Sequence, residues 1–378
     1  ISINLLSSQG EKKFFDPMDV FDLSWASDPQ VSPDGKTIVY VRKSNNIMFD
    51  NTSSNLWQIS VDGKHHQPLF SGLNNYKSPR WSPDGKKLAF ISDESDANQI
   101  HIRWLDSTES AVISNLQESP SSLSWSPNGK WLAFTMNVKS PIEAIVEPRS
   151  KPEGAEWAER PITIVNTRYQ YDGQGIVDPA YRHVFIVSSD GGSVRQLTNG
   201  DFNHNGSLTW SLDSQQVFFS AYRSNNWELV SNEADIYSID IETGELDQIT
   251  TQSGAERSPT MSPNGKYIAF SSQERRPLAF TPKRIALVET QNKEIRILSE
   301  SLDGDADNII WAEDGQSLYF SYDEKGIRNI GEIALNGKYE KIIGGLGGTT
   351  IGRPYLSGGF HVANNIFAYT HGTSDRPS

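Results

Sequence analysis

Short apolar runs and turn sequences alternate along almost the whole chain. In a representative stretch, the turn sequence Ser-Pro-Asp-Gly-Lys at residues 82–86 leads into the apolar run Leu88, Ala89 and Phe90. Ser-Pro-Asp-Gly is typical of a type I turn, because Pro presets φ and Gly accepts the positive φ that follows. A tight turn between two short apolar runs predicts a β-hairpin. The pattern therefore predicts strands over most of the sequence.

This unit recurs seven times. Measured at the Ser position of the turn, successive copies stand 44 to 51 residues apart, except for one spacing of 85 residues. The residues at that position are Ser32, Ser82, Ser126, Ser211, Ser262, Ala312 and Ser357. The copy at Ser211 lacks the Pro and Gly of the turn, and the copy at Ser357 is faint. A period of this length indicates a repeat architecture.

Each unit has room for two further strands. After the hairpin comes another apolar run, such as residues 183–187, then a turn such as residues 190–192, and then a last run such as residues 195–198. Four short antiparallel strands in about 40 to 50 residues is the pattern of a propeller blade. The sequence therefore predicts an all-β fold, namely a seven-bladed β-propeller of four-stranded antiparallel blades with TolB-like repeats.

The last blade is expected to be incomplete. It supplies one strand near residues 351–356 and another near residues 366–370, and the chain ends before two more could follow. The strand at 366–370 would then have an unpaired edge, which invites pairing with another chain. We expect this edge to stay open or to pair with a second copy in a homo-oligomer. Residues 1–6 alternate at the strand period and are the alternative partner, as a borrowed strand.

Two segments fall outside the repeat. Residues 1–27 form an N-terminal arm with a short helix, in which Asp16 is the cap and Pro17 occupies the first position. Residues 28–378 form the propeller. An insertion of about residues 139–181 accounts for the long spacing and falls between the second and third strands of blade three.

The start of the arm leaves the compartment open. Residues 1–9 combine an apolar stretch with small residues, as the tail of a secretory signal does, and this would place the protein in the periplasm or outside the cell. An ordinary extended arm of a cytoplasmic protein is equally consistent with the same residues.

Composition narrows the range of partners and cofactors. The chain has 34 Lys and Arg against 47 Asp and Glu, for a net charge of −13. This charge argues against nucleic acid and against an anionic membrane surface, which both need clustered cations. No run approaches the roughly 18 uncharged apolar residues of a membrane-spanning helix. The absence of cysteine excludes disulfides, thiolate nucleophiles and Cys-ligated metals.

We expect no catalytic residue, metal site or cofactor in this chain. The Gly-x-Ser-x-Gly sequence that exposes a nucleophilic serine is absent. The seven histidines are scattered over several blades, and none has a metal-ligand spacing such as His-Glu-x-x-His.

The insertion is the most informative stretch for function. It holds five acids, Glu143, Glu147, Glu153, Glu156 and Glu159, followed by the sequence Arg168-Tyr169-Gln170-Tyr171-Asp172-Gly173-Gln174-Gly175. One interpretation is a solvated acidic loop and a tight turn closed by an Arg168–Asp172 pair. The other is a substrate-binding group of Arg168, Tyr169 and Asp172, with an acid such as Glu156 that pairs with a substrate's α-amine. The two interpretations are compatible, and a blade-edge insertion is where a propeller gains a specific contact surface.

The order of these motifs resembles the N-terminal propeller of the prolyl oligopeptidase family of serine peptidases, nearest to its acylaminoacyl-peptidase and dipeptidyl-aminopeptidase branch. The resemblance rests on the lead-in at 16–23, the Asp-Pro-Gln-Val-Ser-Pro-Asp-Gly start at 28–35, the Arg168–Gly175 motif, the turn and strand at 190–198, and the closing stretch at 373–377. The plain turn in blade four and the faint seventh copy depart from the family pattern.

The resemblance implies a domain rather than a complete enzyme. In that family the propeller caps a C-terminal α/β-hydrolase domain that carries the Ser-Asp-His triad, and no residue of this chain corresponds to the triad. It implies a propeller that restricts entry to short peptides and helps to bind their amino ends. A stand-alone TolB-like propeller that binds other proteins is the alternative.

Overall fold

Ser-Pro-Asp-Gly turns join the first two strands of antiparallel sheets, as the sequence predicts. In the first copy the Ser32 hydroxyl donates to Asp34 Oδ1 (2.6 Å) and accepts the backbone N–H of Thr37 (3.0 Å), so that side chain and backbone close the turn together. The computed structural model describes residues 16–95, 97–140, 142, 149–158, 162–276, 280–347 and 358–372.

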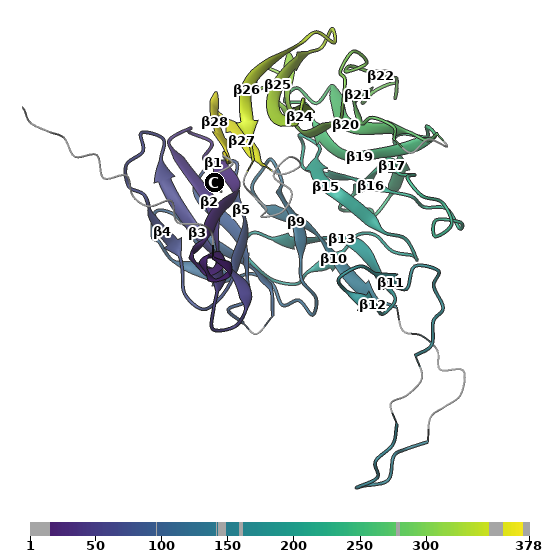
Figure 1. The fold of residues 1–378 in the computed structure, drawn as a ribbon. Helices are drawn as coiled ribbons and strands as arrows, with labels where there is room; N and C mark the ends of the chain where they lie inside the picture. Colours follow the sequence, from purple (N-terminus) through teal and green to yellow (C-terminus); the bar gives the residue numbers. More distant parts are fainter. Residues whose placement is uncertain are drawn as a thin grey trace, which may run out of the picture.

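Six four-stranded sheets follow one another along the chain, each with its strands hydrogen-bonded in chain order (Figure 1). The first three sheets consist of β1 (Ser24–Val31), β2 (Thr37–Asn46), β3 (Asn51–Ser60) and β4 (Gln67–Phe70); β5 (Tyr76–Trp81), β6 (Lys87–Ser92), β7 (Gln99–Trp104) and β8 (Ser110–Val112); and β9 (Ser121–Trp125), β10 (Trp131–Lys139), β13 (Ala180–Ser188) and β14 (Arg195–Gln196). The next three consist of β15 (His204–Trp210), β16 (Gln216–Ala221), β17 (Asp235–Asp240) and β18 (Leu246–Gln248); β19 (Gly254–Met261), β20 (Tyr267–Glu274), β21 (Arg284–Glu289) and β22 (Ile295–Ile297); and β23 (Ala306–Trp311), β24 (Ser317–Glu324), β25 (Ile327–Ala334) and β26 (Tyr339–Leu346). A separate hairpin of β11 (Gln170–Tyr171) and β12 (Gly175–Ile176) belongs to the insertion.

The six sheets stand around a common axis as the blades of a propeller (Figure 1). The first strand of each sheet is innermost, and residues of all six first strands line one central cavity. The aromatic residue that ends the apolar run after the turn is fully buried in five blades, as Phe90, Phe134, Phe219, Phe270 and Phe320. Complete burial of such a side chain stabilises the fold by roughly 1.5–3 kcal/mol.

A tryptophan just before the turn connects neighbouring blades. Its indole Nε1–H donates to a backbone carbonyl in the innermost strand of the preceding blade, in the pairs Trp81–Gln30 (3.1 Å), Trp125–Arg80 (3.0 Å), Trp210–Ser124 (3.2 Å) and Trp311–Thr260 (3.0 Å). At the joint between blades four and five Met261 occupies this position, and its backbone N–H donates to Thr209 Oγ1 (3.2 Å) instead.

The propeller has six four-stranded blades, and the predicted count of seven blades is wrong. The end of the described chain forms only a two-stranded sheet of β27 (Phe360–Ala363) and β28 (Ile366–Tyr369). Its turn is Asn364-Asn365, whose φ values are 49° and 58°. Two successive left-handed residues suit a two-residue hairpin, and Asn tolerates this conformation better than most residues. Counting turn sequences overestimated the number of blades, because the last apolar run of the count belongs to a separate two-stranded hairpin that fits between blades six and one.

The hairpin lies between blade six and blade one (Figure 1). On one side Asn364 Nδ2 donates to the Asp34 carbonyl (2.9 Å), and His361 Nδ1 accepts the backbone N–H of Val31 (3.2 Å). On the other side Phe367 packs edge-on against Tyr319, with 4.9 Å between ring centroids. The strand expected at 366–370 is confirmed as β28. The strand expected at 351–356, the turn copy around Ser357, the closing stretch 373–377 and the borrowed strand at 1–6 lie outside the described residues.

The predicted lead-in helix is present as a short 3₁₀ helix, η1 (Pro17–Asp22). Asp16 accepts the backbone N–H of Met18 (2.9 Å), and Asp19 Oδ2 accepts the backbone N–H of Asp16 (2.9 Å), which completes a capping box. The Val20 carbonyl accepts Asn45 Nδ2 (2.9 Å), so the helix is attached to the end of β2.

The ring has two distinct faces. All innermost strands run in the same sense, so the Ser-Pro-Asp-Gly turns collect on one face, called here the turn face. The connections between second and third strands collect on the opposite face, called here the loop face; their described residues are 47–50, 93–95, 97–98, 140, 142, 149–158, 162–179, 222–234, 275–276, 280–283 and 325–326. Helix η1 and the end of β28 also lie on the loop face. Within the described ranges, no helix has the length and apolar character needed to cross a membrane.

Candidate functional site

The Arg168 motif forms a tight hairpin on the loop face, which confirms the predicted turn. β11 and β12 pair through Gln170–Ile176 and Tyr171–Gly175. Gly173 and Gly175 have φ values of 77° and 72°, which favour glycine.

Arg168 is attached to a neighbouring blade rather than to its own turn. Its Nε donates to the Glu228 carbonyl (3.3 Å), its Nη2 donates to the Val230 carbonyl (3.1 Å), and its guanidinium lies 5.8 Å from the centre of the Trp227 ring. No ion pair within 4.0 Å joins Arg168 to Asp172 in the described part of the chain, so the expected pair is not formed. The carbonyls of the loop between β16 and β17 satisfy the guanidinium, while Asp172 lies exposed at the tip of the hairpin.

A cavity of about 480 Å³ opens beside this hairpin. Its wall includes Arg168, Tyr169, Tyr171 and Trp227, together with Arg182. The cavity combines aromatic and aliphatic surface with two guanidinium groups. That composition suits a short peptide, which has an apolar side chain and a polar backbone.

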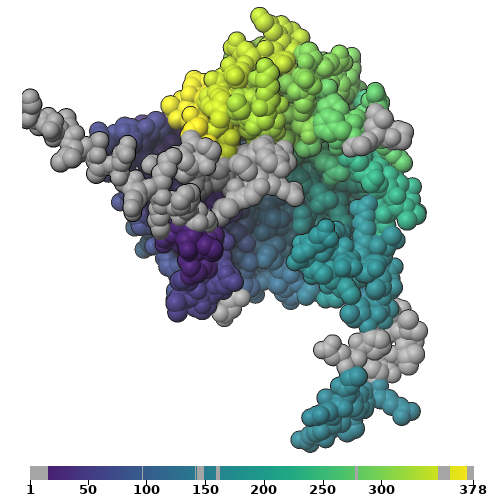
Figure 2. Space-filling model, viewed as in Figure 1, coloured from purple at the N-terminus to yellow at the C-terminus, as the bar shows by residue number. Residues whose placement is uncertain are grey.

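The four predicted site residues, Arg168, Tyr169, Asp172 and Glu156, do not form a single cluster. Arg168 and Tyr169 share the cavity, whereas Asp172 is not part of its wall. Glu156 is exposed on residues 149–158, a segment that extends away from the blades (Figures 1 and 2). Glu153 lies on the same segment, while Glu143, Glu147 and Glu159 lie outside the described residues.

Sequence reasoning missed the contribution of blade four. Trp227 packs edge-on against Tyr181 (6.0 Å between centroids), and Glu228 Oε2 accepts the backbone N–H of Thr167 (3.2 Å). A tryptophan within the polar sequence Ser224-Asn225-Asn226-Trp227 was the available signal, since an aromatic residue in a polar loop needs a packing partner.

Two histidines beside this site are structural. The His183 and His204 rings lie 5.2 Å apart. His204 Nδ1 donates to the Arg182 carbonyl (2.8 Å), and its Nε2 accepts from Arg223 (2.7 Å), so the ring is neutral. Burial lowers the pKa of His204 to about 3. In the part of the chain that the structure describes, no three His, Asp or Glu side chains are arranged to hold a metal ion.

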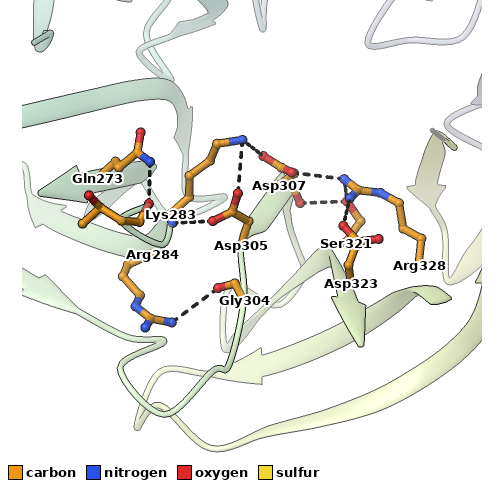
Figure 3. Close-up of polar contacts among 10 residues, drawn as sticks. Gln273, Lys283, Arg284, Gly304, Asp305, Asp307, Ser321, Asp323 and Arg328 are labelled. Atoms are coloured by element: carbon orange, nitrogen blue, oxygen red, sulfur yellow. Dashed lines mark hydrogen bonds and ion pairs between the residues drawn. The ribbon is translucent and has the colours of Figure 1, made fainter. Parts of the chain in front are cut away.

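The central cavity measures about 960 Å³, and most of its charges are paired. Arg80 Nη1 donates to both oxygens of Asp28 (3.0 and 2.9 Å). Lys283 Nζ lies 3.0 Å from Asp307 Oδ1 and 3.8 Å from Asp305 Oδ2 (Figure 3).

Asp307, which pairs with Lys283, also pairs with Arg328 of blade six. Arg328, which is buried, donates to Asp307 Oδ2 (3.2 Å), Asp323 Oδ2 (2.7 Å) and Ser321 Oγ (2.9 Å) (Figure 3). We call Lys283, Asp305, Asp307, Ser321, Asp323 and Arg328 the blade five–six network. It links two blades at the loop-face end of the central cavity.

The loop face also carries a group of exposed apolar side chains. Met48 and Phe49, in the connection between β2 and β3, are 80% and 70% exposed. Others on this face are Met18, Ile47, Ile162, Ile164, Val165, Ile176, Leu229, Phe280 and Ile327. Exposed apolar surface gathered on one face indicates an interaction site.

Fold and site together define a β-propeller with an interaction face built around an insertion. The family model for the dipeptidyl peptidase IV (DPP IV) N-terminal region matches residues 16–118 and 163–276. This match covers more than half of the chain, and the chain belongs to that family. The Arg168 hairpin falls inside the matched residues, whereas Glu156 falls in the unmatched stretch.

Curated relatives are peptidases. The chain is 29% identical over 211 residues to the uncharacterized peptidase YuxL of Bacillus subtilis, covering 56% of this chain and 31% of the relative. It is 25% identical over 347 residues to dipeptidyl-peptidase 5 of Porphyromonas gingivalis, covering 85% and 48%. The chain thus spans half or less of the length of these relatives.

Solved structures show the same fold. The acylaminoacyl peptidase of Pyrococcus horikoshii superposes with a TM-score of 0.70 at 16% identity, over 95% of this chain and 51% of that one. The propeller domain of the Trilobed protease from Pyrococcus furiosus superposes with a TM-score of 0.61 at 16% identity, over 94% and 91%. The resemblance to the N-terminal propeller of a prolyl oligopeptidase-family peptidase is therefore confirmed.

Proposed function

We propose that this peptidase propeller docks through its loop face onto a C-terminal α/β-hydrolase domain, gates the entry of short peptides and helps to bind their amino ends. The observation that carries the proposal is the convergence of four features on one face: the insertion cavity, the exposed apolar side chains, helix η1 and the end of β28. The hydrolase domain supplies the serine nucleophile, and the propeller contributes no catalytic residue and no cofactor.

Docking accounts for the exposed apolar side chains. A side chain such as Phe49 gains roughly 1.5–3 kcal/mol when it is fully removed from water, so several of them can hold a second domain. The chain's net charge of −13 gives no support to nucleic acid or an anionic membrane as the occupant.

Substrate binding is assigned to the insertion. Arg168 and Tyr169 present polar groups to peptide backbone in the cavity, and Trp227 holds the Arg168 guanidinium in place. Asp172 and Glu156 are the carboxylates proposed to meet a peptide's α-amine, because a carboxylate forms a charge-assisted hydrogen bond with an ammonium group.

The docking test titrates this chain with the hydrolase region that the proposal requires the same gene to encode, produced as a separate protein. We expect Phe49→Asp to weaken the association of the two parts at least tenfold, because it places a charge in an apolar contact. The measurement is isothermal titration calorimetry, and Leu212→Asp is the matched control, since Leu212 is 49% exposed on the turn face.

The outcomes separate the two candidate functions. Loop-face docking would be refuted if Phe49→Asp and Leu212→Asp weakened the association with the hydrolase region equally, or if neither substitution weakened it. A gene that encodes no hydrolase region would instead favour the stand-alone TolB-like propeller.

A second experiment tests the substrate site in the protein that carries both the propeller and the hydrolase domain. There, Arg168→Ala is expected to raise KM for a dipeptidyl p-nitroanilide several-fold, and an unchanged KM would remove Arg168 from the substrate site.

A further inference from the structure

Arg257 is a charged side chain without a partner inside the propeller. It is half-buried on β19, and no hydrogen bond, ion pair or aromatic contact of its guanidinium occurs in the described structure. Burial lowers the pKa of Arg257, although a guanidinium remains protonated at neutral pH. A partly desolvated charge with no counter-charge is unfavourable unless a ligand supplies one.

The other cations around the central cavity are neutralised. Arg80 is paired with Asp28, and Lys283 is held by the blade five–six network (Figure 3). Arg80 and Lys283 thus have carboxylate partners, whereas Arg257 on the same cavity wall has none in the described structure. The unpaired charge is therefore particular to Arg257 and not a general property of the cavity.

Arg257 stands where two cavities meet. It lines the central cavity and also a smaller cavity of about 110 Å³. The smaller cavity shares the residues Arg168, Asn203, Asn205 and Trp227 with the 480 Å³ cavity of the insertion. The three cavities therefore adjoin in series from the insertion to the propeller axis.

Hydrogen-bonding groups surround the junction without cancelling its charge. Ser258 and Ser271 line the central cavity beside Arg257, and Asn205 lines the smaller cavity. The carboxylate in the wall of the smaller cavity is Glu233, which is already engaged by Arg275 Nη1 (3.2 Å) and by the backbone N–H of Gly254 (3.0 Å). The junction thus retains the unpartnered guanidinium of Arg257 and several polar groups, while the Arg168 guanidinium in the same wall is held by the Glu228 and Val230 carbonyls.

We propose that Arg257 binds the carboxylate of a short peptide at the junction between the insertion cavity and the central cavity. A guanidinium presents two parallel N–H donors that match a carboxylate, and the surrounding hydroxyl and amide groups can hydrogen-bond the adjoining peptide group. The proposal rests on the proposed function in one respect, namely that short peptides are what the propeller binds. The carboxylate comes from the peptide's C-terminus or from an acidic side chain, since both present the same chemistry to Arg257.

The test uses the present chain without any hydrolase domain, so its result is independent of docking. Acetyl-Ala-Ala with a free carboxylate, acetyl-Ala-Ala-amide and acetyl-Asp-Ala-amide are titrated in turn, and chemical-shift changes give each Kd. We expect at least one acid to bind about tenfold more tightly than the neutral amide, as one charge-assisted interaction predicts. The acid that binds more tightly identifies the source of the carboxylate. Its binding should weaken as salt rises.

Variants then assign the effect to Arg257. Arg257→Gln is expected to abolish the preference for the acids, and Arg257→Lys to keep part of it. Arg195→Gln, at an exposed outer-strand position of blade three, is the control and should keep the full preference. Circular dichroism and the melting temperature establish that each variant is folded. Equal binding of acids and amide by the wild type, or a preference that survives in folded Arg257→Gln, would overturn the proposal.

Discussion

A tryptophan just before the turn serves two blades at once. Its ring contributes apolar surface between the sheets, and its N–H donates to a backbone carbonyl in the innermost strand of the preceding blade. In the Trp125–Arg80 pair the partners are 45 residues apart in sequence, so the interaction joins separate repeats. The residue that marks the repeat in the sequence therefore also holds the repeats together.

Trp125→Phe tests this role. The substitution keeps an aromatic ring but removes the N–H donor, so the hydrogen bond to the Arg80 carbonyl is lost. We expect the free energy of unfolding to fall by about 1–2 kcal/mol, measured by urea denaturation. Trp157→Phe is the control, because Trp157 is exposed on the insertion; a similar loss in both variants would contradict the role assigned to the indole N–H.

Glu256 is a buried acid at the joint between blades four and five. Its side chain is 2% exposed, and neither carboxylate oxygen has a hydrogen-bond partner in the described structure. Burial raises the pKa of Glu256 to about 7, and the nearby carboxylates of Asp235 and Glu233 act in the same direction. Burial likewise raises the pKa of Asp235 to about 6.

These values predict a pH dependence with a definite sign. Between about pH 4.5 and 7 the Glu256 carboxyl is ionised in the unfolded chain but still protonated in the folded one, so stability falls as pH rises. Glu256→Gln removes this contribution. We expect the variant to match the wild type near pH 4 and to exceed it at pH 8 by on the order of 1–2 kcal/mol.

Urea denaturation at several pH values measures the effect. Glu245→Gln, at an exposed position, should reproduce the wild-type pH profile. A Glu256→Gln variant that loses stability with rising pH as steeply as the wild type would show that this carboxyl does not titrate as proposed.

Among the elements, the hairpin β27–β28 depends most on contacts made far away in sequence. It has two strands where every blade has four, and its position is held by Asn364 and His361 against blade one and by Phe367 against blade six. A two-stranded hairpin is marginally stable by itself in water. Its order therefore depends on a close fit to the two blades that flank it.

Gly35→Ala tests that fit. A Cβ at Gly35 would lie 2.8 Å from Asn364 Nδ2, and the φ of 70° adds backbone strain. Gly129→Ala is a matched control, because Gly129 has a φ of 68° and nothing within 4 Å of its Cβ position. We expect both variants to lose about 1 kcal/mol from strain, and Gly35→Ala to lose about 1 kcal/mol more.

Hydrogen exchange locates the additional effect. The amides of β27 and β28 should exchange faster in Gly35→Ala than in Gly129→Ala, because loss of the Asn364 contact releases the hairpin. Equal stability and equal exchange in the two variants would mean that the Asn364 contact does not hold the hairpin.

At the scale of the whole molecule, the propeller is a scaffold that gathers distant segments on one face. The insertion of blade three, the loop of blade four, helix η1 and the end of β28 all reach the loop face. The arrangement creates cavities and an apolar surface, and in the proposed function the hydrolase domain supplies the nucleophile, the base and the oxyanion hole. Chemistry on a peptide bond needs all three.

We therefore expect the chain by itself to be inactive as a peptidase. Purified chain should release no p-nitroaniline from aminoacyl or dipeptidyl p-nitroanilides above the buffer rate. Release that is abolished by a serine-directed inhibitor would contradict this expectation and would place a nucleophile within the propeller.

Local chemistry in the sequence determined the strands, the blade unit, the capped helix and the turn at Arg168. These features depend on residues within a few positions of each other, where Pro, Gly and Asp restrict the backbone and the apolar alternation selects the buried face. The family resemblance rests on the same local motifs.

The tertiary structure decided the number of blades, the partner of Arg168 and the isolation of Arg257. Each depends on groups that only the closed ring brings together: the blade-four carbonyls that satisfy Arg168 lie about 60 residues further along the chain, and the contact of His361 with Val31 spans 330 residues. A turn sequence specifies a hairpin but not how many strands will join it. The pairing of a charge likewise depends on which groups surround it after folding, and spacing in the sequence does not contain that information.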